Sequence, residues 1–577
     1  MNSNPRKFSP SLVIFLALFI GQAVFLAPWV ERERNAAGLS YAPEPGLEIP
    51  ADIRLLETAL GGFRGWLINF LWLRAGQLED EGRAHESMQL ARWITRLQPN
   101  FPEVWIFQSS NLTLTQSVAA TSPEERYLWV DSGIALLRDE AIPINRESRV
   151  IYRELSYYFW FKLGDESPDE MREYYWRKIA AEWDQNLGEP HGETGAERAA
   201  WLAPLGEAPR EVSVLFRRYP ELVEEPEERK KIEAMLDGDL RNFLAFVSRG
   251  ERGHEPYASW LAHAKFGPAR EALVAYVRAK VLREQYGMDP LLMIELTQEL
   301  GPIDWRHPST HAIYWSAVGE LRIETGEAFP RLTDETRESI YRTHFLTLGL
   351  RQLVGRGRIS GDPVEGELIH APEFLCIESY ERAIFGDEFE TATLVPEYSE
   401  VPYWRILEAA LESAWLRGND EVAQHCLDRL RRFYEERITD PREWLLLRLE
   451  ADLPTDPAEL ATELNGRVAQ QYFSMILEGW GEENETVTEN RRDLAERLWS
   501  RATLGGSTLQ SLAELEAEAI EGFLEVSPLV ASARSKATAW RKLSAEQRSA
   551  VSTALYQALR DSARRAGLDP ETSFPRD

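Results

Sequence analysis

Cysteine is nearly absent from this chain, and basic residues are few beside the acidic ones. The 577 residues include two cysteines, 65 lysines and arginines, and 94 aspartates and glutamates, so the formal net charge is −29. Two cysteines exclude a disulfide scaffold and a cysteine-based zinc finger. The acidic balance argues against nucleic-acid binding, because such binding needs a basic surface that neutralises phosphates.

Strand patterns and catalytic motifs are also lacking. Alternating runs of β-branched residues bounded by Asn-Gly turns are nearly absent. The sequence has no Gly-x-Ser-x-Gly nucleophile elbow and no phosphate-binding loop that ends in Gly-Lys-Ser/Thr. Gly355 and Gly357 belong to a stretch too short for a dinucleotide-binding fingerprint. The sequence therefore predicts no catalytic residue and no cofactor.

One long apolar run is present near the amino terminus. Residues 11–30 carry no charge, and 20 residues are enough to cross the ~30 Å hydrocarbon core of a bilayer. Arg6 and Lys7 precede the run, so the positive-inside rule predicts a cytoplasmic segment 1–10 and a single transmembrane helix 11–30. A cleaved signal peptide is the alternative, with Gly21-Gln22-Ala23 as a small-x-small site.

Either interpretation predicts that the bulk of the chain is exported across an inner or cytoplasmic membrane of bacterial type. Residues 31–50 are rich in proline and glycine and are expected to form a linker. The charge is distributed unevenly, since the first 35 residues and residues 531–577 are mildly basic while the body between them is strongly acidic. This acidity favours solubility and a basic protein partner.

Helix start signals recur along the body. Ser122 and Ser167 are each followed directly by Pro and, three places after the Ser, by Glu. Asp456 begins the same pattern with an aspartate in place of the serine. A short polar side chain caps the first amides, proline fits the first helical position, and glutamate reaches back to the cap. Ser544 is predicted to open a last helix over 544–566. Apolar side chains between such caps recur at helical spacing, as in Trp404, Leu407, Leu411 and Trp415.

The helices are predicted to pair in hairpins whose starts lie 35 to 45 residues apart, at about 67, 102 and 147. Residues 71–102 and 407–430 resemble tetratricopeptide repeats. The positions that carry the resemblance are Ala75, Leu78, Gly82, Ser87, Ile94 and Pro99 in the first segment, and Gly418, Ala423 and Leu427 in the second. Leu411 departs from the pattern, because it is large where the family has a small residue.

The predicted fold class is therefore all-α, with an N-terminal transmembrane helix followed by a solenoid of helical hairpins that resembles tetratricopeptide repeats. We expect repeats over 51–190, a helical middle region with long loops over 191–400, and further repeats over 401–530. Residues 531–577 are expected to form a basic C-terminal helical cap, because the terminal repeat of an array needs a polar outer face.

Two features are candidates for chemistry. His307 and His311 lie four residues apart around Pro308 and could share a helix face as metal ligands, although no third ligand is placed by spacing. The competing interpretation is a helix cap at His307 and a packed side chain at His311. Cys376 and Cys426 could form a disulfide in an exported chain, or be two small buried residues.

The resemblance implies protein–protein interaction. We expect a non-enzymatic, membrane-anchored scaffold whose exported solenoid binds protein partners in a cell-envelope assembly. The alternative is an anchored all-α carbohydrate-active enzyme of toroid type, suggested by 19 Trp and 19 Tyr in an acidic, exported chain. An open helical array with packed tryptophans favours the scaffold, and a funnel of exposed tryptophan and acidic side chains favours the enzyme.

Overall fold

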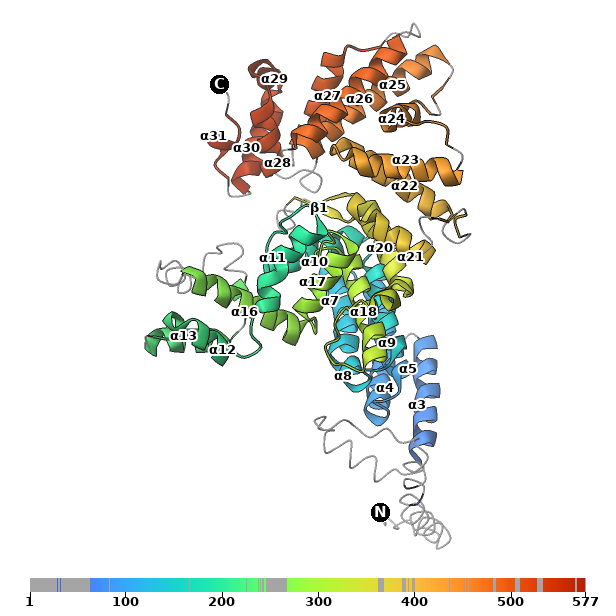
Figure 1. The fold of residues 1–577 in the computed structure, drawn as a ribbon, viewed down its shortest axis with the longest axis vertical. Coiled ribbons are helices and arrows are strands. Elements are labelled where there is room, and N and C mark those ends of the chain that lie inside the picture. Colours follow the sequence, from blue (N-terminus) through green and yellow to red (C-terminus); the bar gives the residue numbers. More distant parts are fainter. Residues whose placement is uncertain are drawn as a thin grey trace, which may run out of the picture. The chain divides into compact units, whose positions relative to one another are not determined.

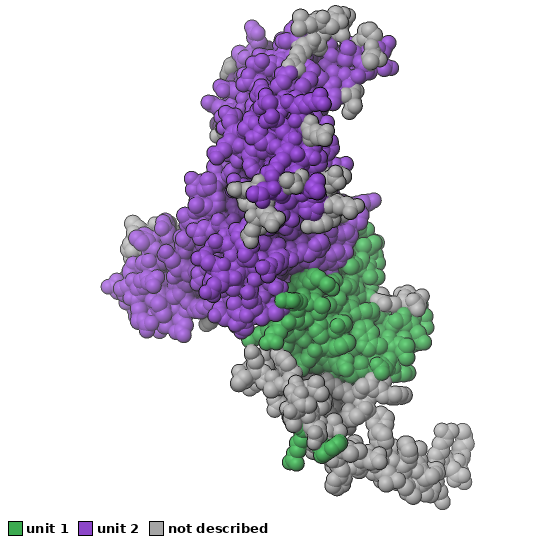
Figure 2. All heavy atoms as spheres, turned by 45° about the vertical axis from the view of Figure 1, so that its right-hand side comes forward, with its two compact units in different colours: residues 1–154 green, residues 155–577 purple. Residues whose placement is uncertain are grey.

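The computed structural model shows a chain built almost entirely of helices (Figure 1). Two compact units are distinguished, Met1–Glu154 and Leu155–Asp577, and Figure 2 colours them separately. The described residues are 29, 32, 63–81, 83–164, 167–224, 226–236, 238, 240, 243–244, 267–361, 368–386, 391–392, 394–396, 400–434, 436–451, 453–454, 456–480, 484–503, 509–526, 533–565 and 568–575.

Unit 1 consists of successive helices. Their bounds are α3 (Phe63–Asp80), α4 (Ala84–Leu97), α5 (Pro102–Ser110), the π-helical turn η1 (Asn111–Gln116), α6 (Ser117–Ala119), α7 (Pro123–Ala135), the π-helical turn η2 (Leu136–Ala141), α8 (Ile142–Ile144) and the first part of α9 (Arg149–Tyr157). The helices start close to the predicted positions. At α7 the predicted cap is confirmed, because Ser122 Oγ accepts a hydrogen bond from the Glu125 amide.

The hairpin of α3 and α4 holds the first set of repeat-like positions. Ala75, Leu78, Ser87 and Ile94 are all buried, as close packing of two helices through small and apolar residues requires. The Pro99 carbonyl accepts hydrogen bonds from Trp105 and Asn145, which fixes the end of α4 against the following helices. Gly82 lies outside the described residues. The membership of the repeat family stays a prediction, whereas the helical class is confirmed.

The first part of unit 2 runs from the end of α9 to residue 385. Its elements are η3 (Tyr158–Lys162), α10 (Arg172–Leu187), α11 (Gly195–Glu207), α12 (Val212–Arg218), η4 (Pro220–Leu222), α13 (Pro226–Leu236), α16 (Gly267–Gln285), α17 (Pro290–Leu300), α18 (Pro308–Thr325), α19 (Arg337–Tyr341), α20 (His344–Arg356), β1 (Arg358–Ser360), β2 (Ile369–Ala371), η6 (Phe374–Cys376) and α21 (Ile377–Phe385). β1 and β2 pair antiparallel with Ile359 opposite His370. From the sequence we expected helices and long loops over 191–400 and no strands, so this hairpin was not predicted.

One predicted helix start was wrong. The pattern at Ser167 predicts a helix from Pro168, but α10 begins at Arg172. The Asp169 carboxylate lies 2.6 Å from the Lys162 ammonium and accepts hydrogen bonds from the Tyr175 hydroxyl and the Met171 amide. Because both side chains of the ion pair are buried, this contact outweighs the local capping preference and delays the helix.

The second part of unit 2 is again helical. It consists of α22 (Glu400–Leu416), α23 (Asp420–Tyr434), α24 (Pro441–Glu450), α25 (Pro457–Ser474), η9 (Met475–Trp480), α26 (Glu485–Thr503), α27 (Leu512–Glu525), α28 (Ala533–Lys542), α29 (Ala545–Ala550), α30 (Thr553–Arg565) and α31 (Pro570–Ser573). Gly418 turns α22 into α23 with a φ of 75°, a conformation that favours glycine. Ala423 and Leu427 are buried in this hairpin, and so is the large Leu411.

The C-terminal helices share a core with their neighbours. Apolar side chains of α25, η9, α26 and α27 form one buried cluster with those of α28 and α30 and with Phe574. Ser544 caps α29 as predicted: its Oγ accepts a hydrogen bond from the Gln547 amide, and the Gln547 side chain accepts one from the Ser544 amide. The single helix expected over 544–566 is however two helices, because the chain leaves helical geometry at Val551, whose side chain turns into the core.

The transmembrane part of the predicted fold class is corrected. Among the described residues, no helix combines the length and the apolar character that crossing a membrane requires. Even α3, which has no charge over residues 65–73, carries Arg64, Arg74, Glu79 and Asp80. The segment 11–30 itself lies outside the described residues apart from Trp29, as do residues 1–10 and nearly all of 31–50. The described part of the chain is therefore helical apart from the β1–β2 hairpin, and no membrane span is assigned within it.

Candidate functional site

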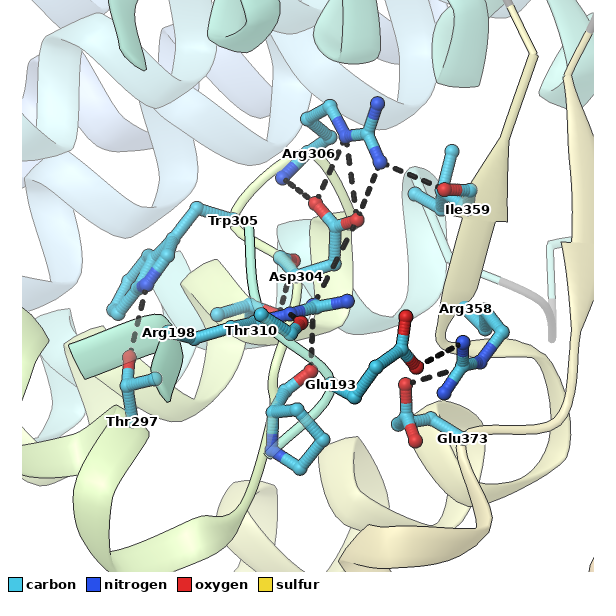
Figure 3. A network of polar contacts seen from close by, with 12 residues as sticks. Glu193, Arg198, Thr297, Asp304, Trp305, Arg306, Thr310, Arg358, Ile359 and Glu373 are labelled. Carbon is cyan, nitrogen blue, oxygen red and sulfur yellow. Dashed lines mark hydrogen bonds and ion pairs between the residues drawn. The ribbon is translucent and has the colours of Figure 1, made fainter. Parts of the chain in front are cut away.

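The loop that precedes α18 lies at the centre of a buried polar network in unit 2 (Figure 3). α17 ends at Leu300, and the next residue, Gly301, has a φ of 105°, which favours glycine. A Cβ atom there would stand 3.0 Å from the Leu375 carbonyl oxygen and 3.2 Å from the Cys376 sulfur. The absence of a side chain thus lets the loop pass directly against η6.

Asp304 is the buried acceptor of this network. Its carboxylate accepts hydrogen bonds from the amide, Nε and Nη2 of Arg306 at 2.9, 3.0 and 2.7 Å. The Arg198 guanidinium of α11 lies 4.0 Å away and donates to the Pro302 carbonyl at 2.6 Å. Burial alone would raise the pKa of Asp304, but the charge and hydrogen bonds of Arg306, with help from Arg198, hold it below its usual value.

The same guanidinium reaches the β-hairpin. Arg306 Nη2 donates to the Ile359 carbonyl of β1 at 2.7 Å. The Thr310 hydroxyl of α18 donates to the Asp304 carbonyl at 2.7 Å, and the Trp305 indole donates to Thr297 of α17 at 3.1 Å. One short loop is therefore tied to α11, α17, α18 and β1, although Arg198 and Ile359 lie 359 − 198 = 161 residues apart in the sequence.

A second acid beside β1 is less well paired. Arg358 Nη1 lies 2.8 Å from Glu193, and Arg358 Nε lies 3.5 Å from Glu373. The Glu193 side chain is 75% exposed, whereas that of Glu373 is only 1% exposed. Burial raises the pKa of Glu373 in spite of Arg358, while the pKa of Glu193 is lowered because Arg358 outweighs its partial burial. Glu373 is thus the buried carboxyl whose charge the network compensates least.

The two candidate histidines, His307 and His311, have partners within the chain. His307 is the N-cap of α18, and its Nδ1 accepts the Ser309 amide at 3.1 Å. Burial lowers the pKa of His307 well below its usual value, so the ring is neutral and its remaining proton sits on Nε2, where it blocks metal ligation. His311 Nε2 lies 2.9 Å from the Trp305 carbonyl, and its ring stacks on Phe159. The described residues contain no group of three or more His, Cys, Asp or Glu side chains placed to hold a metal.

A histidine that sequence reasoning missed lies beside His307. The rings of His307 and His370 have centroids 5.8 Å apart, and Trp176 packs against His370 at 4.2 Å. His370 Nδ1 lies 3.3 Å from the Arg356 carbonyl. Burial, with a further contribution from the Arg356 charge, lowers the pKa of His370 to about 3. The pair is therefore neutral near pH 7, with His307 fully buried and His370 partly buried in unit 2.

The Glu381 carboxylate accepts hydrogen bonds from three side chains outside this network. The Tyr403 hydroxyl donates to it at 2.6 Å, His425 Nε2 at 3.0 Å and Arg429 Nη2 at 3.2 Å. Burial alone would raise the pKa of Glu381, but His425 and the other donors lower it, and the same bond to Glu381 raises the pKa of His425. This cluster joins α21, α22 and α23.

The two cysteines do not form a disulfide in this structure. Cys376 of η6 and Cys426 of α23 are both free and buried. Burial raises the pKa of each thiol, which leaves them protonated and unreactive near pH 7.

The surface of unit 1 has a different character. Nine large apolar side chains are clearly exposed among the described residues after residue 62, and six of them belong to this much smaller unit. They are Phe70, Leu73, Trp93, Phe101, Val118 and Leu128, against Phe329, Leu394 and Leu447 in unit 2. Trp93 is 64% exposed, and no other described tryptophan after residue 62 is classed as exposed.

The buried network and the exposed surface suit different tasks. Asp304, Glu373 and Glu381 are closed off from solvent, so they connect segments of the fold and offer no entry to a substrate. Sequence reasoning selected the segment 301–315 for its histidines but missed Asp304, Arg306 and their distant partners. The Asp-x-Arg spacing around Trp305 was the available signal. In comparisons with known proteins, no family model, no curated protein and no solved structure matches this chain.

Proposed function

We propose that this chain is a helical scaffold that binds a protein partner through unit 1. The observation that supports the proposal is the concentration of exposed large apolar side chains on α3 to α7. Clusters of exposed apolar residues on a folded protein mark interaction sites, because leaving them in water costs free energy that a partner can recover. The resemblance to tetratricopeptide repeats and the helical hairpins agree with the same role.

Trp93 and Leu128 are the side chains on which we expect partner binding to depend. Tryptophan is enriched among the few interface residues that carry most of the binding energy. Trp93 lies on α4 and Leu128 on α7, with exposed fractions of 64% and 61%. The net charge of −29 favours a partner that surrounds its apolar contacts with basic residues.

The enzyme alternative has less support. A polysaccharide-cleaving toroid needs exposed tryptophans that converge with carboxylates, whereas Trp105, Trp176, Trp183, Trp305 and Trp315 are all buried. Their role in the described residues is core packing.

The test begins with affinity capture, in which the full wild-type chain is used to isolate its partner. The purified partner is then titrated against the wild type and its variants. We expect Trp93→Ala and Leu128→Ser each to weaken binding about tenfold or more. Leu447→Ser is the matched control, since Leu447 is an exposed leucine of unit 2. Equal weakening by the control, or an unchanged affinity of both unit 1 variants, contradicts the proposal.

A further inference from the structure

Arg278 of α16 is a partly buried arginine that the rest of the described chain leaves without a direct partner. Its Nε is closed off from solvent, and burial lowers the pKa of Arg278 more than the charge of Asp184 raises it. Among the described residues, the guanidinium has neither a hydrogen-bond acceptor nor an ion-pair partner. Asp184 therefore acts on it only from a distance.

The buried arginines of the described residues have carboxylate partners. Taking a cation out of water costs free energy, and a carboxylate close by offsets this cost. The guanidinium-to-carboxylate distances are 2.7 Å for Arg306–Asp304, 2.9 Å for Arg491–Glu412, 3.2 Å for Arg429–Glu381 and 4.0 Å for Arg198–Asp304. Arg278 departs from this pattern, so a negative group from outside the chain is expected beside it.

The guanidinium of Arg278 lies against the end of α10, a helix that is labelled with α16 in Figure 1. Gly188 follows the last residue of α10 and has a φ of 82°, which favours glycine. A Cβ atom there would stand 3.1 Å from Nη2 of Arg278 and 3.6 Å from Nη1. Any other residue would crowd both nitrogens, so the glycine keeps this side of the guanidinium free of a neighbouring side chain.

A second unpartnered donor lies in the last turn of α10. Asn186 is 2% exposed, and its Nδ2 has no hydrogen-bond acceptor among the described residues. Buried amide groups normally have a partner, because an unmade hydrogen bond costs free energy. The unpartnered groups at this end of α10 are thus N–H donors, which a ligand with acceptor oxygens would satisfy.

Charge indicates which oxygen ligand fits. A guanidinium is planar and pairs with a planar carboxylate through two parallel hydrogen bonds. The nearby charge of Asp184 disfavours an anion with two charges more than an anion with one. A carboxylate carries one negative charge, whereas a phosphate group carries about 1.5 to 2 at pH 7.

From this geometry we infer that Arg278 binds the carboxylate group of a small organic acid beside Gly188. Because Arg278 is only partly exposed, a small molecule reaches it more readily than a side chain on a folded partner. A single ion pair of this kind is weak, with a dissociation constant on the order of 5–10 mM. The site belongs to unit 2 and does not depend on the partner proposed for unit 1.

Hydrogen exchange of the full chain, read by mass spectrometry, tests the site with sodium acetate against sodium chloride at equal ionic strength. Binding slows an opening that releases the ligand by the factor 1 + [L]/Kd. About 50 mM acetate should therefore slow exchange in α16 and in the last turn of α10 about six- to tenfold. A wild type that exchanges equally fast in both salts overturns the inference. Slower exchange in phosphate than in acetate overturns the choice of a carboxylate.

Substitutions assign the effect to Arg278. Arg278→Met keeps an aliphatic side chain and removes the guanidinium, so acetate should no longer slow exchange. Arg278→Lys keeps the charge without the planar fork and should retain less than half of the slowing. Arg342→Met is the matched control, because Arg342 is an exposed arginine directly after α19, and it should respond like the wild type.

A cation near the end of α10 is also favourable by itself, because it interacts with the helix dipole. That role alone predicts no response to acetate. Slowing by acetate that persists in Arg278→Met, or that Arg342→Met also loses, overturns the inference. Circular dichroism shows whether the variants fold. If Arg278→Met does not fold, full slowing in Arg278→Lys overturns the inference and reduced slowing supports it.

Discussion

The two units differ in which unusual residues they contain: one exposes apolar side chains and the other buries charged ones. Unit 1 exposes apolar side chains, among them Phe70, Leu73 and Trp93. Unit 2 buries charged ones, among them Asp304, Arg306 and Glu373. Burying a charge is costly unless it is paired, and exposing apolar surface is unfavourable unless a partner covers it. The contrast indicates that unit 2 uses its buried charges to hold its own segments together, and it agrees with our proposal that unit 1 binds another protein.

Removing the Asp304 charge is the strongest way to test the role of the buried network. Asp304→Asn leaves the Arg306 and Arg198 guanidinium groups inside unit 2 without their carboxylate. We expect a loss of about 3–5 kcal/mol in the free energy of unfolding, as for other buried pairs that lose one partner. Urea unfolding followed by tryptophan fluorescence measures it. Glu193→Gln, at an exposed acid of the same network, should change stability by less than about 0.5 kcal/mol.

Two adjacent positions of α3, one buried and one facing outward, test how the two faces of this helix are assigned. Ala75 is fully buried against α4, and Gly76 beside it faces open space. Ala75→Leu should destabilise the chain by about 1–3 kcal/mol, because a larger side chain overpacks the hairpin. Gly76→Ala should stabilise the α3 helix by about 0.5–1 kcal/mol. Hydrogen exchange of the α3 and α4 amides distinguishes them. Similar protection changes in both variants would mean that the faces are assigned wrongly.

The histidine pair predicts an acid-sensitive unit 2. The folded pKa of His370 is lowered to about 3 while its usual value is near 6.5, so the neutral ring stabilises the fold above about pH 6.5. This stability is lost as the pH falls from 6.5 towards 3, by up to about 1.4 kcal/mol per pH unit for one proton. The Asn amide in His370→Asn can still donate to the Arg356 carbonyl. This variant should lose about 1 kcal/mol less stability than the wild type between pH 6 and pH 5.

Thermal melts at stepped pH measure this difference. His344→Asn is the control, because His344 is an exposed histidine at the start of α20. An acid profile of His370→Asn that parallels the wild type would show that the pKa of His370 is not lowered in the folded chain.

Substitution of Glu373 is expected to have the smallest effect on stability, and at pH 8 this effect has the opposite sign from that of the Asp304 substitution. Its folded pKa is raised, so stability is full below its usual value near pH 4.5 and is lost as the pH rises through the folded pKa. Glu373→Gln removes this loss and should leave stability within about 1 kcal/mol of the wild type at pH 5. At pH 8 the variant should be the more stable of the two. Melting temperatures at the two pH values decide it, and a variant less stable at pH 8 refutes the raised pKa.

Local signals predicted much of the helical architecture. The caps at Ser122, Asp456 and Ser544 were predicted correctly, because an N-cap depends on residues only two or three places apart. The helix start predicted at Ser167 was wrong, because Asp169 forms a buried ion pair with Lys162. The site was predicted less well: of the residues in the segment 301–315, the histidines were chosen and Asp304 and Arg306 were not.

The sequence by itself determined that the chain is helical, that α3 and α4 pair as a hairpin, and that its net charge is strongly negative. These properties follow from capping, helical periodicity and composition, which act over short distances along the chain. The tertiary structure alone decided that Asp304 meets Arg198 of α11, that Arg306 reaches β1, and that His307 lies beside His370. Such pairs lie 50 or more residues apart, and among 94 acidic residues no spacing identifies the few that folding removes from water.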